Sequence, residues 1–299
     1  MIKKLTVLFA GSVLAIQFAG AQIETGTSSG AQALDRARSA PVAPNAAPEE
    51  EVVVVYDAKG VKEVFIEEVP EKMWSLNVST GWDSLYMFRG ANVLGNNNGL
   101  YWVGGDLGVS PWEGGSVSAG FWYAVGTSNP SNYQELNVFA DITQSVGNFD
   151  LSLGWINYSY PVVSWELPTQ NEIYLGAAYN IEIGSVSIAP SAIYFYNVGP
   201  VVQDKSYLLL GIDASVPLTD MVSLDPWFAY GINFGFNTDA NGNEYDGSSN
   251  VELGVSMPVQ ITDYFSVAGY IAYSHAIENN FGTTDANTFW GGVSANFSF

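Results

Sequence analysis

The sequence predicts an all-β fold, a transmembrane antiparallel β-barrel of about 12 strands with short periplasmic turns and longer external loops. Three observations lead to this prediction. The chain begins with a segment typical of secretory signals. From Trp74 to Phe299, segments of about ten residues alternate between apolar and polar side chains. Short and long connections then alternate between these segments.

Residues 1–21 are interpreted as a signal peptide. Lys3 and Lys4 precede an apolar run from Leu5 to Phe18, and Ala19-Gly20-Ala21 has the small-x-small pattern of a cleavage site. An uncleaved membrane anchor is the alternative. The chain has no cysteine, so an exported protein of this sequence must fold without disulfides.

Two segments separate the signal from the barrel. Residues 22–50 are rich in Ala, Ser, Thr, Gly and Pro and predict a disordered linker. Residues 51–73 form the next segment, where β-prone runs at Val52–Tyr56 and Val61–Val69 flank a turn-like stretch at residues 57–60. We expect this periplasmic segment to be a hairpin, a plug that enters a pore, a peptide that docks on a partner, or a partly ordered tail.

Twelve alternating segments make up the predicted barrel, residues 74–299. They cover residues 74–90, 99–110, 116–126, 133–145, 149–160, 171–180, 185–196, 206–217, 222–234, 251–260, 263–275 and 287–299. The connections after even-numbered segments are tight, and most of those after odd-numbered segments are longer and more polar. This asymmetry is typical of an outer-membrane barrel in a Gram-negative-type envelope, and an even strand number places both termini in the periplasm.

One face of these segments is apolar, whereas the other is small, polar or acidic. In a membrane barrel the second face lines the lumen, because charges facing lipid are costly. This parity predicts one inward base, Arg89, and eight inward acids: Asp83, Asp106, Glu135, Asp141, Glu172, Asp213, Asp225 and Glu252. Two hypotheses remain open. The acids are scattered hydrated groups in a wide pore, or Arg89 faces two or more carboxylates at a constriction that orients solutes.

The C-terminal segment ends on Phe297 and Phe299, which share the apolar parity. Terminal strands ending in Phe resemble the insertion motif of outer-membrane barrels, which implies the barrel assembly machinery as a partner. We also expect Trp82, Tyr86, Tyr264 and Phe265 to lie in the aromatic girdles at the membrane interfaces.

The first predicted strand carries Tyr86, Phe88, Arg89 and Gly90 in the pattern Tyr-x-Phe-Arg-Gly. This pattern, with the segments that follow it, resembles the TorF family of porins. The resemblance covers the layout of the barrel, and its motif covers the first two or three strands. It implies an outer-membrane barrel and leaves the transported solute undefined.

Catalytic and metal-binding chemistry finds little support in the sequence. The single histidine, His275, has the apolar parity and is expected to face the membrane interface, whereas Ser274 points the other way. No cofactor is predicted. Asp239, Asn241, Asn243 and Asp246 begin like a calcium loop, but Glu244 stands where the loop needs glycine, so they are a weak metal candidate beside a solvated acidic loop.

The charge balance reduces the number of functions that fit this sequence. The chain has 9 Lys and Arg against 30 Asp and Glu, and loss of Lys3 and Lys4 with the signal leaves a net charge of −23, so nucleic-acid binding is excluded. We expect a passive, cation-preferring channel for small hydrophilic solutes in contact with outer-membrane lipid and lipopolysaccharide, and not an enzyme. The alternative is a structural or adhesive surface protein with a filled or plugged barrel. The oligomeric state is undefined.

Overall fold

The computed structural model describes residues 50–57, 60–68, 73–95, 98–127, 133–161, 169–199, 204–239, 243–277 and 287–299, with backbone alone for residues 50–68. The predicted signal peptide and all of the predicted linker except Glu50 lie outside the described residues. No helix in the described ranges is long and apolar enough to cross a membrane.

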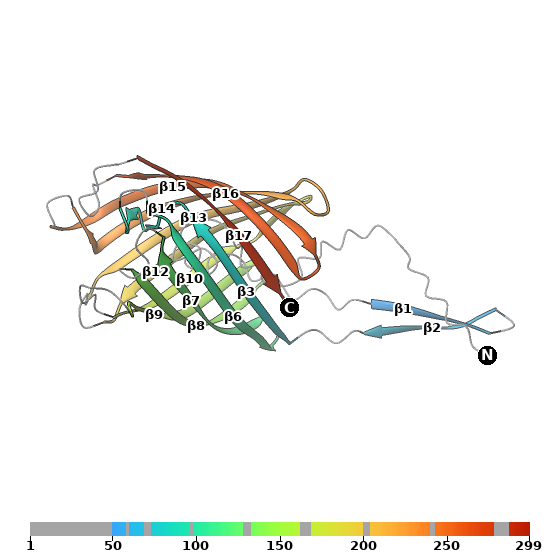
Figure 1. Ribbon diagram of the computed structural model, residues 1–299. Helices are drawn as coiled ribbons and strands as arrows, with labels where there is room; N and C mark the ends of the chain where they lie inside the picture. Colours follow the sequence, from blue (N-terminus) through green and yellow to red (C-terminus); the bar gives the residue numbers. More distant parts are fainter. Residues whose placement is uncertain are drawn as a thin grey trace.

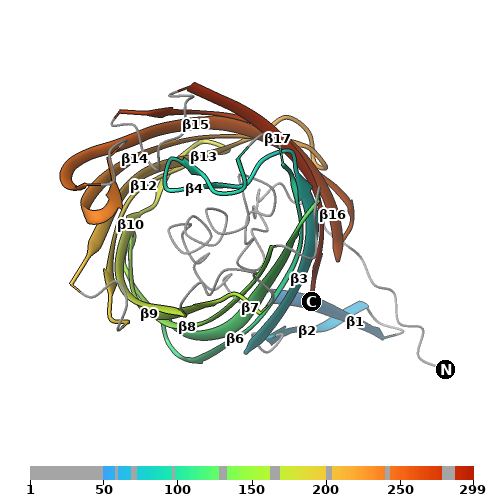
Figure 2. The ribbon, with the colours of Figure 1, turned by 60° about the vertical axis from the view of Figure 1, so that its left-hand side comes forward.

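The main sheet closes into an antiparallel barrel of 12 strands. Thirteen strand segments follow one another around the sheet, and β10 pairs with β12 to close it. Because β10 and β11 are two parts of one strand interrupted at Asn180, the barrel has 12 strands. Figure 1 and Figure 2 show the barrel from two sides. The predicted fold class is confirmed.

The strands of the barrel are β3 (Trp74–Asp83), β6 (Leu100–Trp112), β7 (Gly115–Gly126), β8 (Gln134–Val146), β9 (Phe149–Ser159), β10 (Gln170–Tyr179) with β11 (Ile181–Ile183), β12 (Val186–Asn197), β13 (Ser206–Pro217), β14 (Ser223–Thr238), β15 (Glu244–Thr262), β16 (Phe265–Ala276) and β17 (Asn287–Ser298). A separate two-stranded sheet, β1 (Glu50–Asp57) with β2 (Gly60–Glu68), precedes it and pairs with no barrel strand in the described ranges.

The alternation of the sequence explains the two faces of the wall. In β15, Leu253 and Met257 are exposed on the outside, whereas Glu252 and Ser256 are buried on the inside. Likewise Phe121 of β7 is exposed and its neighbour Trp122 is buried. An exposed apolar outer face is what a hydrocarbon environment requires.

The two ends of the barrel differ in their connections. Turns of two to five residues join β6 to β7, β8 to β9, β11 to β12, β13 to β14 and β15 to β16 at one end, which we name the short-turn end. The start of β3 and the C-terminus also lie there (Figure 1), and the Ser110 amide at the end of β6 donates to the Met73 carbonyl. Phe299 is fixed by two backbone hydrogen bonds to Leu76, of 2.9 and 3.1 Å. The opposite end, with longer connections, is named the long-loop end.

Two predicted strand boundaries are wrong. The segment at residues 181–185 was expected to be a turn, but Ile181–Ile183 pairs with β12 and leaves a turn of two residues. The loop expected at residues 236–250 is largely strand, because β14 continues to Thr238 and β15 already begins at Glu244. Long polar stretches therefore belong to the sheet where it extends beyond its apolar band.

A third correction concerns the first predicted strand. β3 ends at Asp83, and the chain then turns into the lumen as a small hairpin of β4 (Met87–Phe88) and β5 (Ala91–Asn92). Figure 2 shows β4 inside the ring of barrel strands. We name residues 85–94 the inner hairpin. Tyr86 consequently lies in the interior, only 2% exposed, and its expected place in an aromatic girdle is wrong.

Candidate lumen constriction

The inner hairpin reverses at Arg89 and Gly90. Both have positive φ, 48° and 83°, the pattern of a two-residue type I′ turn. Glycine adopts this conformation freely, but in an arginine it costs about 1–2 kcal/mol. Contacts of the Arg89 side chain must therefore hold the turn, because local preference alone opposes it.

Side chains on the inner hairpin contact three sectors of the wall. Leu85 and Met87 pack in a cluster with Trp227, Tyr270, Ala272 and Trp290 from β14, β16 and β17. Tyr86 packs with Leu100, Trp102, Trp122 and Ala124 from β6 and β7. Phe88 packs against a third cluster that includes Ile156, Tyr158, Phe195 and Tyr207 from β9, β12 and β13. The inner hairpin thus spans the lumen between opposite parts of the wall.

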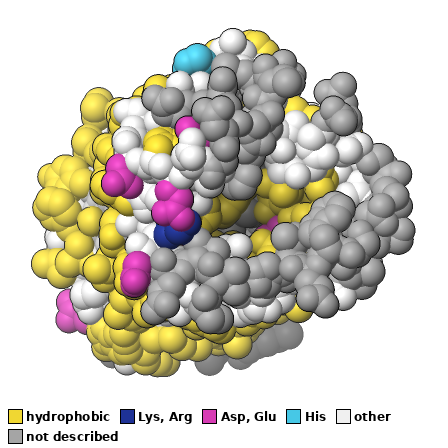
Figure 3. Space-filling model, turned by 90° about the vertical axis from the view of Figure 1, so that its left-hand side faces the viewer, with side chains coloured by type: hydrophobic (Ala, Val, Ile, Leu, Met, Phe, Trp, Pro, Cys, Tyr) yellow, Lys and Arg dark blue, Asp and Glu magenta, His cyan; other side chains and the backbone are white. Residues whose placement is uncertain are grey.

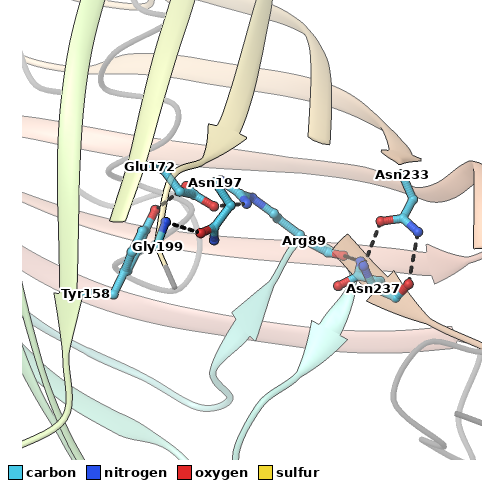
Figure 4. Close-up of polar contacts among 7 residues, drawn as sticks. All are labelled: Arg89, Tyr158, Glu172, Asn197, Gly199, Asn233 and Asn237. Atoms are coloured by element: carbon cyan, nitrogen blue, oxygen red, sulfur yellow. Dashed lines mark hydrogen bonds and ion pairs between the residues drawn. The ribbon is translucent and has the colours of Figure 1, made fainter. Parts of the chain in front are cut away.

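An ion pair fixes the tip of the inner hairpin. The Arg89 guanidinium donates to both carboxylate oxygens of Glu172 on β10, through Nη1 at 2.8 Å and Nη2 at 2.9 Å (Figure 4). Tyr158 donates a further hydrogen bond to Glu172 at 3.0 Å. Arg89 is 2% exposed and Glu172 is 1% exposed. Such a bidentate pair is strong and directional, and removing one partner leaves an uncompensated buried charge.

Four aromatic rings surround the same guanidinium. The Arg89 Cζ lies 4.3 Å from the ring centre of Phe195, 4.5 Å from Phe236, 4.8 Å from Phe88 and 5.0 Å from Tyr207. Each of these distances is within cation–π range, and burial strengthens the attraction. The positive charge of Arg89 is therefore compensated by both the carboxylate and the rings.

The backbone of the turn is held from a third side. Asn237 donates from Nδ2 to the Arg89 carbonyl at 3.3 Å, and Asn233 fixes Asn237 by two hydrogen bonds of 2.7 and 3.0 Å (Figure 4). Gly90 lies against Asn250, so that a Cβ at position 90 would stand 2.6 Å from the Asn250 Cβ. Only glycine satisfies both the close approach and the positive φ at this position.

Glu135 on β8 is held by three neutral donors. It accepts hydrogen bonds from Tyr86 at 2.7 Å, from Asn137 at 2.8 Å and from Tyr133. Tyr133 lies in the connection before β8, where burial, and then the Glu135 carboxyl, raises the pKa of its hydroxyl well above the usual range. Both tyrosines consequently act as donors to Glu135.

The other predicted inward acids are distributed along the wall. Asp83, Asp106, Asp225 and Glu252 are buried, whereas Asp141 and Asp213 are partly exposed. Neutral donors contact several of them: Tyr270 to Asp83 at 2.6 Å, Asn77 to Asp106 at 3.1 Å, Ser118 to Asp141 at 2.8 Å and Ser215 to Asp225 at 2.6 Å. The inner hairpin contacts two of the eight acids directly: Glu172 through Arg89 and Glu135 through Tyr86.

Charge in the barrel region is strongly one-sided. Residues 73–299 contain 20 Asp and Glu but only two bases, Arg89 and Lys205. Arg89 pairs with Glu172, and Lys205 pairs with Glu244 near the long-loop end. Figure 3 looks onto that end, where several acidic side chains lie on one side of the opening and hydrophobic side chains cover the outer wall beside them. Acids therefore outnumber bases tenfold in this part of the sequence.

The sequence candidates for other chemistry lie apart from this constriction. His275 is exposed on the outer face and contacts Asn287 at 3.0 Å, whereas Ser274 is buried on the inner face. Asn243 donates to Asp239 at 2.8 and 3.2 Å, Asp246 belongs to β15, and Asn241 lies outside the described residues. Within the described ranges, no three His, Cys, Asp or Glu side chains are grouped to hold a metal ion.

The two C-terminal phenylalanines are exposed: Phe297 stacks on Phe265, and Phe299 stacks on Tyr264.

The sequence interpretation missed the aromatic lining around Arg89. It described the inward face as small, polar or acidic, but near the long-loop end that face also carries Tyr158, Tyr174, Phe195 and Tyr207. The signal was present in β12 and β13, because Phe195 and Tyr207 have inward parity. Parity alone could not show what covers these rings, because it does not reveal that the segment after Asp83 enters the lumen.

Comparisons with known proteins support the fold. No protein-family model matches the sequence, and no curated protein sequence matches it. An outer membrane channel from Pseudomonas putida F1 is similar in structure, with a TM-score of 0.51 and 11% identity over 77% of this chain and 97% of that chain. The NanC porin has a TM-score of 0.46 and 10% identity over 74% of this chain and 98% of that chain. The translocator domain of the autotransporter NalP from Neisseria meningitidis has a TM-score of 0.39 and 12% identity over 77% of this chain and 90% of that chain. The fold is that of outer-membrane β-barrels.

Proposed function

We propose that this protein is a porin-like outer-membrane channel for passive diffusion of small hydrophilic solutes, with a preference for cations. The observation that carries the proposal is the contrast between an apolar outer wall and an acidic interior in a closed barrel of 12 strands. A lumen of this kind accommodates polar solutes, and the lipid-facing surface accommodates the membrane.

The cation preference follows from the charge balance of the barrel. Arg89 and Lys205 each engage one carboxylate, so neither is a free anion-attracting group in the lumen. Carboxylates such as Asp141 and Asp225 contact hydroxyl donors instead of bases. Because the Debye length is about 8 Å at physiological salt, these charges act across a narrow lumen.

A second candidate is a structural or adhesive surface protein whose barrel does not conduct. The inner hairpin favours it, since the three clusters that hold the hairpin occupy opposite parts of the wall. Both candidates share the same fold, and they differ in whether a continuous aqueous path remains beside residues 85–94.

Conductance of the purified full-length protein in planar bilayers separates the two candidates. A channel should give discrete current steps. In a KCl gradient, the sign of its reversal potential should show preference for potassium over chloride, and the magnitude of this potential should fall at high salt. A folded barrel without current would favour the structural alternative. Current with chloride preference would contradict the assigned role of the acids while retaining the channel.

The orientation in the membrane belongs to the same proposal. We place the short-turn end and both termini in the periplasm, which leaves the long-loop end in contact with lipopolysaccharide, and we assign insertion to the barrel assembly machinery through Phe297 and Phe299. The likeness to the TorF family also remains a proposal. In whole cells, a membrane-impermeant maleimide should label the variant Asn241→Cys and leave Asp220→Cys unlabelled. The reverse labelling would show that the short-turn end faces the cell exterior.

A further inference from the structure

The groups that surround the Arg89 guanidinium come almost entirely from the barrel wall. Glu172 lies on β10, Phe195 on β12, Tyr207 on β13 and Phe236 on β14, four strands that follow one another in the sheet. Phe195 and Tyr207 are direct partners in the strand register. Phe88, in contrast, belongs to the inner hairpin. We name Glu172, Phe195, Tyr207 and Phe236 the wall cage.

Contacts that do not involve Arg89 help to hold the wall cage. Tyr158 donates to Glu172 at 3.0 Å, and Tyr207 donates to Asn250 at 2.7 Å. Phe195 and Tyr174 also pack against each other, with ring centres 5.8 Å apart. Glu172, Phe195 and Tyr207 are each at most 1% exposed. The wall cage is therefore preorganised by its own neighbours, which lowers the free-energy cost of binding.

We propose that the wall cage is a binding site for guanidinium and related organic cations, and that Arg89 is its tethered occupant. The carboxylate of Glu172 matches the two parallel N–H groups of a guanidinium, and aromatic faces bind this weakly hydrated cation better than a compact, strongly hydrated ammonium. A solute ending in a guanidinium group can make the same contacts as Arg89. The wall cage thus discriminates among cations by shape and hydration as well as by charge.

Tethering makes Arg89 a strong competitor. An intramolecular ligand acts at an effective concentration in the millimolar range or above, so a free guanidinium compound must exceed it before it displaces Arg89. Displacement would release the tip of the inner hairpin from the wall. Binding and opening are therefore linked, and the site is best tested where Arg89 has been removed.

The direct test is calorimetric titration of purified, full-length Arg89→Ala protein with ethylguanidinium chloride, with ethylammonium chloride at equal concentration as the control. We expect saturable binding with a Kd on the order of 1 mM for ethylguanidinium, and at least about tenfold weaker binding of ethylammonium. The double variant Arg89→Ala with Glu172→Gln should bind ethylguanidinium at least about tenfold more weakly. Absence of saturable binding, or equal binding by the double variant, would overturn the proposal.

A second measurement uses the wild-type protein in case Arg89→Ala does not fold. The Val93 amide donates to the Tyr86 carbonyl within the inner hairpin at 2.9 Å, and the Ser110 amide donates to Met73 at the short-turn end, also at 2.9 Å. Ethylguanidinium at about 100 times the expected Kd should accelerate hydrogen exchange at Val93 several-fold and leave Ser110 unchanged. Unchanged exchange at Val93 would overturn the proposal. Neither measurement involves current, so failure here leaves the proposed channel function intact.

Discussion

The two halves of the lumen differ in the partners of their charged side chains. Toward the long-loop end, Arg89 and Glu172 form a bidentate pair inside a layer of aromatic rings, and the inner hairpin fills the space between walls. Toward the short-turn end, Asp141, Asp150 and Asp225 contact neutral serine and asparagine donors, and no base of residues 73–299 joins them. One half is packed around a paired charge, whereas the acids named in the other half contact neutral donors.

This difference assigns separate tasks to the two halves. Packing and a paired charge give the long-loop half a fixed geometry, which suits a constriction that sets the size of a passing solute. Uncompensated carboxylates give the short-turn half a negative potential, which suits selection by charge. The comparison predicts that variants in the first half change stability and conductance, and that variants in the second half change selectivity.

The largest effect is expected at the buried ion pair. Glu172→Gln removes the charge that compensates Arg89 and should destabilise the inner hairpin by about 3–5 kcal/mol. Hydrogen exchange at the Val93 amide reports this opening directly. The paired variant Arg89→Met with Glu172→Leu removes both charges and should cost less than Glu172→Gln alone. Equal exchange in wild type and Glu172→Gln would show that the ion pair does not hold the inner hairpin.

A smaller effect is expected at Gly90, for which the chain offers a matched control. Ala at Gly90 or at Gly95 adopts an unfavourable positive φ, 83° or 60°, at a cost of about 1–2 kcal/mol. At Gly90 the new Cβ also meets Asn250, whereas at Gly95 nothing lies within 4 Å. Gly90→Ala should therefore be worse by a further amount of about 1–3 kcal/mol. Equal unfolding midpoints for the two variants would rule out the close contact with Asn250.

The smallest effect is expected in the acidic half. Asp213→Asn and Asp225→Asn each remove one inward charge and should move the reversal potential in a KCl gradient toward zero without changing the unfolding midpoint substantially. Asp220→Asn, in the exposed turn after β13, is the control and should leave the potential unchanged. If all three variants behave alike, Asp213 and Asp225 do not line the conducting path.

The sequence predicted the wall of this barrel better than its interior. Alternation in β7 and β15 is sufficient to assign faces, because a strand places successive side chains on opposite sides and the membrane demands an apolar outside. Alternation also continues through Tyr86 and Phe88 after β3 ends, so periodicity predicted one long strand where the chain turns inward. The decisive contact, Arg89 with Glu172, joins residues 83 positions apart and overrides the local preference against a positive φ in arginine.

The candidate site was predicted in composition and not in arrangement. Parity correctly indicated that Arg89 and Glu172 belong to the interior, where both are buried. It gave no information on which carboxylate Arg89 would contact, since that choice depends on strand stagger and on the length of the inner hairpin. It also gave no reason to expect Phe236, because the polar stretch around it was interpreted as loop.

Narrowing of a conducting barrel by the inner hairpin can be tested directly. Single-channel conductance of wild type should be compared with that of a variant in which residues 85–94 are replaced by a short Gly-Ser linker, after both are shown to be folded. The variant should conduct several-fold more current and admit larger polyethylene glycols than wild type. Equal conductance and equal size exclusion in the two proteins would contradict it.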